Sequence, residues 1–127
     1  MSLFVSDSFT DTDGTSLASH TGEIGATWAA MAASTLVPTI QSNSLDSGAS
    51  DGNAFYYASG VPYSADYSAS CDIVRNTSAL SAAGVGVRIA TGHHTGYFGI
   101  FFSGNGAVGS IYRYFLGSLT LLAEGNT

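Results

Sequence analysis

The sequence contains no lysine, and its charge is low and mostly of one sign. Nine acidic side chains stand against three arginines, Arg75, Arg88 and Arg113, which gives a formal net charge of −6. Because an acidic chain without a basic stripe repels phosphate backbones, nucleic-acid binding is excluded. The near absence of Lys and Glu excludes a coiled coil. Seven Phe, seven Tyr and one Trp argue against intrinsic disorder.

Cysteine and long apolar runs are also scarce. Cys71 is the only cysteine, so no disulfide can form within the chain. No stretch approaches the roughly 20 consecutive apolar residues that span a bilayer. The first seven residues lack the basic segment and apolar run of a secretory signal. We therefore expect a soluble protein with no membrane partner, folded as one domain over residues 1–127.

The residues that are present favour short β-strands. From Asp66 to Ile73, apolar and polar side chains alternate as in a half-buried strand, which makes Cys71 a small core residue. Trp28–Ala33 has helical propensity, but it is too short to be stable alone, and we expect the sheets to override it. Further strands are predicted at residues 36–40, 53–59, 84–90, 97–102 and 108–115, and from residue 119 onward.

The spacing of these strands indicates the fold class. No long amphipathic helix separates them, which is typical of an all-β protein built as an antiparallel β-sandwich. Within the single predicted domain, residues 1–35 form an irregular N-terminal strand and loops, and residues 36–127 supply the strands of the sandwich.

One set of residues matches the pattern of a known domain family. The set is Asp7, Phe9, Asp13, Gly14, Leu17, His20, Gly22, Gly25 and Trp28, followed by Gly86-Val87-Arg88, Ile111-Tyr112-Arg113 and Leu119 to Ala123. The pattern resembles the concanavalin A-like, or laminin G-like, jelly-roll domains of tailed-phage virion proteins and bacterial surface proteins. The resemblance covers nearly the whole chain. It makes Asp7, Phe9, Asp13, Gly14, His20, Gly25 and Trp28 a structural signature, in which His20 anchors a loop.

The C-terminus departs from this family pattern. Such domains usually continue for several strands beyond Leu119–Ala123, whereas this sequence ends at Thr127. A sandwich shortened there leaves unpaired strand edges and uncovered apolar faces, which favour association. We therefore expect neighbouring subunits to complete the sandwich, unless the sequence is part of a longer product.

Few residues are suited to catalysis or to metal binding. A glycosidase needs two carboxylates facing one bond, and the two glutamates, Glu23 and Glu124, lie far apart in the sequence. We expect no enzymatic activity, no catalytic residue and no required cofactor. Asp11 and Asp13, which precede Gly14, could present oxygen ligands to calcium, although a plain structural turn is the favoured alternative.

A sugar site is the main rival to a structural role. Lectin sites combine an aromatic platform with amide or carboxylate partners for hydroxyl groups. The candidate residues are Tyr56, Tyr57 and Tyr97 for the platform and Asn53 and Asn105 as partners.

The resemblance implies a non-enzymatic structural protein of a phage virion, such as a capsid decoration protein or a head or tail fibre component. Its expected partners are further copies of itself and other virion proteins such as the major capsid protein. The alternative is a lectin-like module that binds cell-surface glycans.

Overall fold

A computed structural model describes residues 2–48, 52–74, 81–90, 92, 94–103 and 108–126. These residues contain strands and no helix, and every paired strand is antiparallel, which confirms the all-β prediction. The chain divides into two compact units, residues 1–65 (unit 1) and residues 66–127 (unit 2), which are described separately. That residues 1–127 form a single domain stays a prediction.

Unit 1 is held by two short strand pairs. β1 (Trp28–Ala30) pairs with β4 (Tyr56–Ala58), and β2 (Thr39–Ile40) pairs with β3 (Leu45–Asp46). The alanine-rich segment from Trp28 is therefore a strand, as expected, because pairing with β4 overrides its helical propensity. The apolar residues buried in this unit are Leu17, Ala26, Met31 and Ile40.

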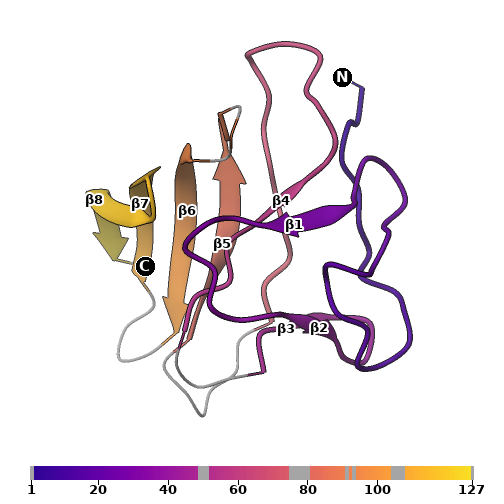
Figure 1. Cartoon of the computed structure of the whole chain (residues 1–127). Coiled ribbons are helices and arrows are strands. Elements are labelled where there is room, and N and C mark those ends of the chain that lie inside the picture. The colour runs from indigo at the N-terminus through magenta and orange to yellow at the C-terminus, as the bar shows by residue number, and fades with distance from the viewer. Residues whose placement is uncertain are drawn as a thin grey trace. The chain divides into compact units, whose positions relative to one another are not determined.

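Unit 2 is one four-stranded antiparallel sheet. Its strands are β5 (Ser81–Val87), β6 (Thr95–Ser103), β7 (Val108–Phe115) and β8 (Ser118–Asn126). They lie side by side in chain order, β5-β6-β7-β8, so each pairs with its neighbour in the sequence (Figure 1). They overlap four of the five strands predicted in this part of the chain, although β5 begins and ends three residues earlier than the predicted 84–90. The turn around Asn105 lies outside the described residues.

The predicted strand at residues 66–73 is wrong. The described residues 66–74 form no strand, and Cys71 is exposed rather than buried in the core. The apolar positions that suggested a strand include Ala69 and Cys71, whose small side chains gain little free energy from burial. Alternation alone cannot order a strand when no neighbouring edge pairs with it.

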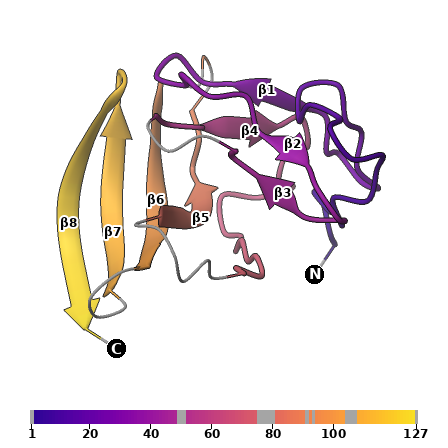
Figure 2. The same ribbon diagram turned by 90° about the horizontal axis from the view of Figure 1, so that it is seen from below.

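The β7–β8 hairpin fixes the outer edge of the sheet. Its two turn residues, Leu116 and Gly117, have φ of 47° and 88°, the left-handed conformation that two-residue hairpin turns require. A register shift follows at Ile111/Tyr112, which leaves Leu122 as the extra residue of a β-bulge. β8 is the last strand of this sheet, and no described residue pairs with its outer edge (Figure 2).

Glycines in β5 allow close packing within the sheet. A Cβ on Gly84 would lie 1.9 Å from the Gly99 carbonyl oxygen, and one on Gly86 would lie 2.6 Å from the Phe98 ring. The Phe98 ring in turn packs edge-on against buried Tyr114, with centroids 5.8 Å apart. By contrast, a Cβ on Gly109 meets no atom within 4 Å.

We predict that Gly84→Ala lowers the free energy of unfolding by about 1–3 kcal/mol, because the added methyl group overpacks the β5–β6 pair. Gly109→Ala is the matched control. It should be neutral or slightly stabilising, because alanine reduces the conformational entropy of the unfolded chain. Urea unfolding followed by far-ultraviolet circular dichroism measures both, and equal stability of the two variants would contradict the register of β5 and β6.

Candidate functional site

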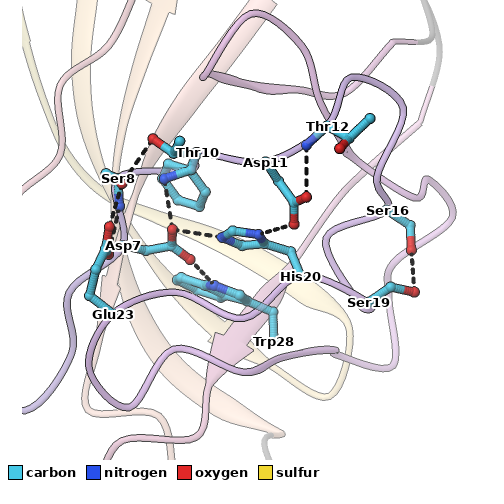
Figure 3. A network of polar contacts seen from close by, with 11 residues as sticks. Asp7, Ser8, Thr10, Asp11, Thr12, Ser16, Ser19, His20, Glu23 and Trp28 are labelled. Atoms are coloured by element: carbon cyan, nitrogen blue, oxygen red, sulfur yellow. Dashed lines mark hydrogen bonds and ion pairs between the residues drawn. The ribbon is translucent and has the colours of Figure 1, made fainter.

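The densest polar cluster among the described residues surrounds His20 in unit 1. The ring lies between two carboxylates: Nε2 is 2.9 Å from Asp7 Oδ1, and Nδ1 is 2.9 Å from Asp11 Oδ2. Figure 3 shows Asp7 and Asp11 on opposite sides of the ring, with Trp28 against the far oxygen of Asp7. The side chains of His20 and Asp7 are each 3% exposed, and that of Asp11 is 35% exposed. We call these four residues the His20 cluster.

Asp7 accepts hydrogen bonds from two groups besides His20. Its Oδ1 also accepts the Phe9 backbone N–H at 2.7 Å, and its Oδ2 accepts the Trp28 indole N–H at 2.6 Å. The Phe9 hydrogen bond holds that residue at a φ of 52°, a left-handed conformation that is costly for phenylalanine. Gly22 leaves room for the carboxylate, because a Cβ there would lie 2.5 Å from Asp7 Cγ.

The geometry favours the charged form of His20. An ionised carboxylate only accepts hydrogen bonds, so each ring nitrogen must carry a hydrogen, and a histidine with two N–H groups is the imidazolium cation. The hydrogen bond to Asp11 is the main cause that raises the pKa of His20 above its ordinary value of 6.5, with Asp7 adding to it and burial opposing it. The charged form of His20 is therefore paired on both sides, and this pairing extends it to higher pH than for a free histidine.

Hydrogen-bond donors lower the pKa of two exposed carboxylates near His20, those of Asp11 and Glu23. The His20 hydrogen bond, followed by the Thr12 backbone N–H, lowers the pKa of Asp11. The pKa of Glu23 is lowered chiefly by the hydroxyl of Ser8, which donates to Oε1, while the Ser8 backbone N–H donates to Oε2 at 3.0 Å.

This arrangement does not provide a nucleophile and its base. General-base catalysis needs an imidazole nitrogen that is free to take a proton from the attacking group. Both nitrogens of His20 are bonded to carboxylates, and the nearby hydroxyl of Ser8 donates to Glu23 instead. The chemistry that the cluster supports is structural: it fixes the path of the chain from Asp7 to Trp28.

The predicted structural signature is partly brought together. Asp7, Phe9, His20 and Trp28 meet in one place, where the Phe9 ring centroid is 5.9 Å from that of Trp28 and 6.4 Å from that of His20. The other three residues shape loops elsewhere in unit 1: Asp13 accepts the Ser42 backbone N–H at 2.7 Å, Gly14 donates to the Ile40 carbonyl, and Gly25 accepts from Gly60 N–H.

The two candidate calcium ligands have separate partners. Asp11 bonds to His20 and Thr12, whereas Asp13 bonds to Ser42. Within the described parts of the chain, no group of three or more His, Cys, Asp or Glu side chains is arranged to hold a metal ion. The contacts of Asp11 and Asp13 are those of turn and cluster residues.

The candidate sugar residues are spread over both units. Tyr56 and Tyr57 are adjacent on β4, so their side chains point to opposite faces, and both are half-buried. Asn53 is exposed in the segment before β4, Tyr97 is exposed on β6 in unit 2, and Asn105 lies outside the described residues. Tyr56, Tyr57 and Asn53 thus share unit 1, and the sugar site stays a prediction.

The sequence did not predict the link between Asp11 and His20, because Asp11 was interpreted as a turn residue or a calcium ligand. The distribution of charged residues along the sequence could have indicated this contact. All three arginines lie in residues 66–127, so His20 is the only basic side chain among residues 1–65, which hold six acidic ones. A buried cation attracts the acidic groups around it, and only His20 could supply that charge.

A second candidate feature is the apolar surface of unit 2. Exposed large apolar side chains gather on its last two strands and their turn: Ile111, Phe115, Leu116, Leu119, Leu121 and Leu122. An open groove lies over the same sheet and is lined by Val85, Phe101 and Ile111, with Ile73 at its side. By the register of β7 and β8, Ile111 and Phe115 lie on one face of the sheet, and Leu119 and Leu121 lie on the other. Both faces of this edge therefore expose apolar side chains, which is typical of an interaction site.

No family model matches this sequence, and no curated protein or solved structure matches it significantly. The jelly-roll resemblance therefore stays a prediction. The described part of the chain also contains no helix of the length and apolarity that a membrane crossing requires.

We predict that Asp7→Asn lowers the free energy of unfolding by about 2–4 kcal/mol, because an amide replaces the acceptor of three donors and leaves a buried cation half-paired. Urea unfolding measured by the fluorescence of Trp28 reports this loss. The control is Asp46→Asn, an exposed residue on β3, which should change stability by less than about 0.5 kcal/mol. Equal effects of the two variants would contradict the role of Asp7.

Proposed function

We propose that this chain is a non-enzymatic structural protein that assembles with further copies of itself through unit 2. The observation that carries the proposal is strand β8. Its outer edge has no partner among the described residues, and it exposes Leu119, Leu121 and Leu122. An edge strand with exposed apolar side chains favours pairing with another chain.

The sequence of β8 lacks most of the usual protections of an open edge. It contains no proline and no lysine, and its only charged residue is Glu124, near its end. The bulge at Leu122 interrupts regular pairing, so a second strand would pair along Ser118–Leu121, before the bulge. Leu119 and Leu121 lie within this regular stretch and Glu124 lies outside it.

Charge favours a second copy as the partner. Residues 66–127 hold three acidic side chains and three arginines, so their formal charges cancel, whereas residues 1–65 carry the whole net negative charge. Two neutral surfaces approach each other without repulsion, and a neutral surface promotes association.

The family resemblance supplies the wider context of the proposal. The domains that the sequence resembles occur in tailed-phage virion proteins, and a jelly-roll sandwich completed by neighbouring subunits suits an open-edged sheet. In this proposal the chain is a capsid decoration protein or a head or tail fibre component, located in the virion, with the major capsid protein as a further partner. Many copies of one weak contact would together hold the assembly through avidity.

The alternative, a lectin-like module for cell-surface glycans, makes a different prediction. It requires a self-sufficient monomer that binds sugars through Tyr56, Tyr57 or Tyr97. A monomer that is retained on a glycan array would support this alternative.

We predict that the protein forms oligomers whose association weakens at least tenfold in Leu121→Lys, because a charge on the open edge must be desolvated on pairing. Light scattering coupled to size-exclusion chromatography, over about 1–100 μM protein, measures the mass. Val37→Lys, an exposed position in unit 1, adds the same charge and should leave the mass unchanged. A wild-type monomer at the highest concentration would overturn the proposal.

A further inference from the structure

His20 and its partner Asp7 are held more firmly than its other partner, Asp11. Its backbone N–H donates to the Ser16 carbonyl at 3.0 Å, and its buried ring lies beside that of Phe9, with centroids 6.4 Å apart. Asp7 is equally buried and is held by two further donors. Asp11 is the partner that reaches solvent.

The three acidic groups that act on His20 are known from the contacts. Asp7 and Asp11 bond to the ring directly, and Glu23 acts on it at longer range through charge. No arginine or lysine occurs among residues 1–65, so no other cationic side chain of unit 1 can replace the imidazolium. Loss of the proton from His20 therefore removes the only side-chain cation of this unit.

A neutral imidazole has one N–H group, so it can keep only one of the two hydrogen bonds. If Nε2 lost its hydrogen, a nitrogen lone pair would face the Asp7 carboxylate at 2.9 Å, and both side chains are too buried for bulk solvent to screen the repulsion. If Nδ1 lost its hydrogen, the lone pair would face Asp11, which can turn toward water. The second state costs less free energy.

We propose that the His20–Asp11 contact is a pH-sensitive latch: as pH rises, His20 keeps its bond to Asp7 and releases Asp11. The released segment is Thr10–Thr12. It is bounded by Phe9, which remains bonded to Asp7, and by Asp13, which remains bonded to Ser42. The core of unit 1 and the strand pairs β1–β4 and β2–β3 stay in place.

The sign of the effect on stability follows from the direction of the pKa shift. Below the ordinary histidine value of 6.5, both folded and unfolded chains carry the proton, and the stabilisation is fully present. It is lost as pH rises through the raised pKa of folded His20. Asp11, whose pKa is lowered, contributes above 3.8 and loses its contribution as pH falls through its folded value.

The test is an NMR titration of the full-length protein between pH 5 and pH 9. Long-range nitrogen–proton spectra report the tautomer of His20, and the amide signal of Thr12 reports the latch. We expect His20 to titrate above 6.5, to become the Nε2–H tautomer, and to shift the Thr12 amide with the same midpoint. The urea midpoint of unit 1, read from Trp28, should fall over the same pH range.

Asp11→Asn is the diagnostic variant. An asparagine amide can accept a hydrogen bond from charged His20 or donate one to the neutral ring, so the fall in the urea midpoint between pH 5 and pH 9 should shrink by at least half. The His20 midpoint should also move back toward its ordinary value. Asp13→Asn, which changes a carboxylate in the same loop that does not touch His20, should leave the titration unchanged.

Three outcomes would overturn the latch: a neutral Nδ1–H tautomer, a Thr12 amide that does not follow His20, or an Asp11→Asn variant with the pH response of the wild type. None of these readouts depends on oligomer formation. A failure of the assembly proposal therefore leaves the latch intact, and the reverse also holds.

Discussion

The interaction on which unit 1 depends is the pairing of one buried imidazolium with two carboxylates. Strand pairs of two or three residues order little of this unit, and the chain from Asp7 to Trp28 makes few regular backbone contacts. The His20 cluster takes their place: it joins Asp7, Asp11 and Trp28, which lie up to 21 residues apart. Burying these charges is favourable only because every hydrogen-bonding group on them has a partner. The hydrogen bonds and ion pairs of the His20 cluster therefore order unit 1 as much as its small apolar core does.

Unit 2 is ordered in a different way. Its long strands pair over seven to nine residues each, and aromatic rings pack across them, as Phe98 does on Tyr114 and Phe102 on Tyr112. No buried ion pair is found in its described part, and its formal charges cancel. Apolar residues that a single sheet cannot cover remain exposed on β7 and β8. Unit 1 is therefore acidic, and its buried charged groups have partners within the unit. Unit 2 has no net formal charge, and it exposes apolar side chains that a partner could bury.

The sequence was most informative where structure is local. Alternation and turn chemistry predicted β6 to β8 closely and β5 with a displacement of three residues, because a strand and its neighbouring turn are encoded by adjacent residues. The same reasoning failed for residues 66–73, where apolar and polar side chains alternate but no strand pairs with the segment. In the site, Asp7, Phe9, His20 and Trp28 were selected by their resemblance to a family pattern, and the structure brings them together. The role of Asp11 was not predictable from a local pattern, because it depends on a contact with a residue nine positions away.

The chain-order pairing of β5 to β8 has a kinetic consequence. Each strand of this sheet pairs with its neighbour in the sequence, so only short loops must close before its contacts form. Unit 1 instead joins residues such as Gly25 and Gly60, whose approach requires a long loop to close first. Folding rates fall as the sequence separation of contacts grows, so the apolar sheet should form early and the acidic unit late. The surface of the proposed contact between copies would then form while the N-terminal unit is still unfolded.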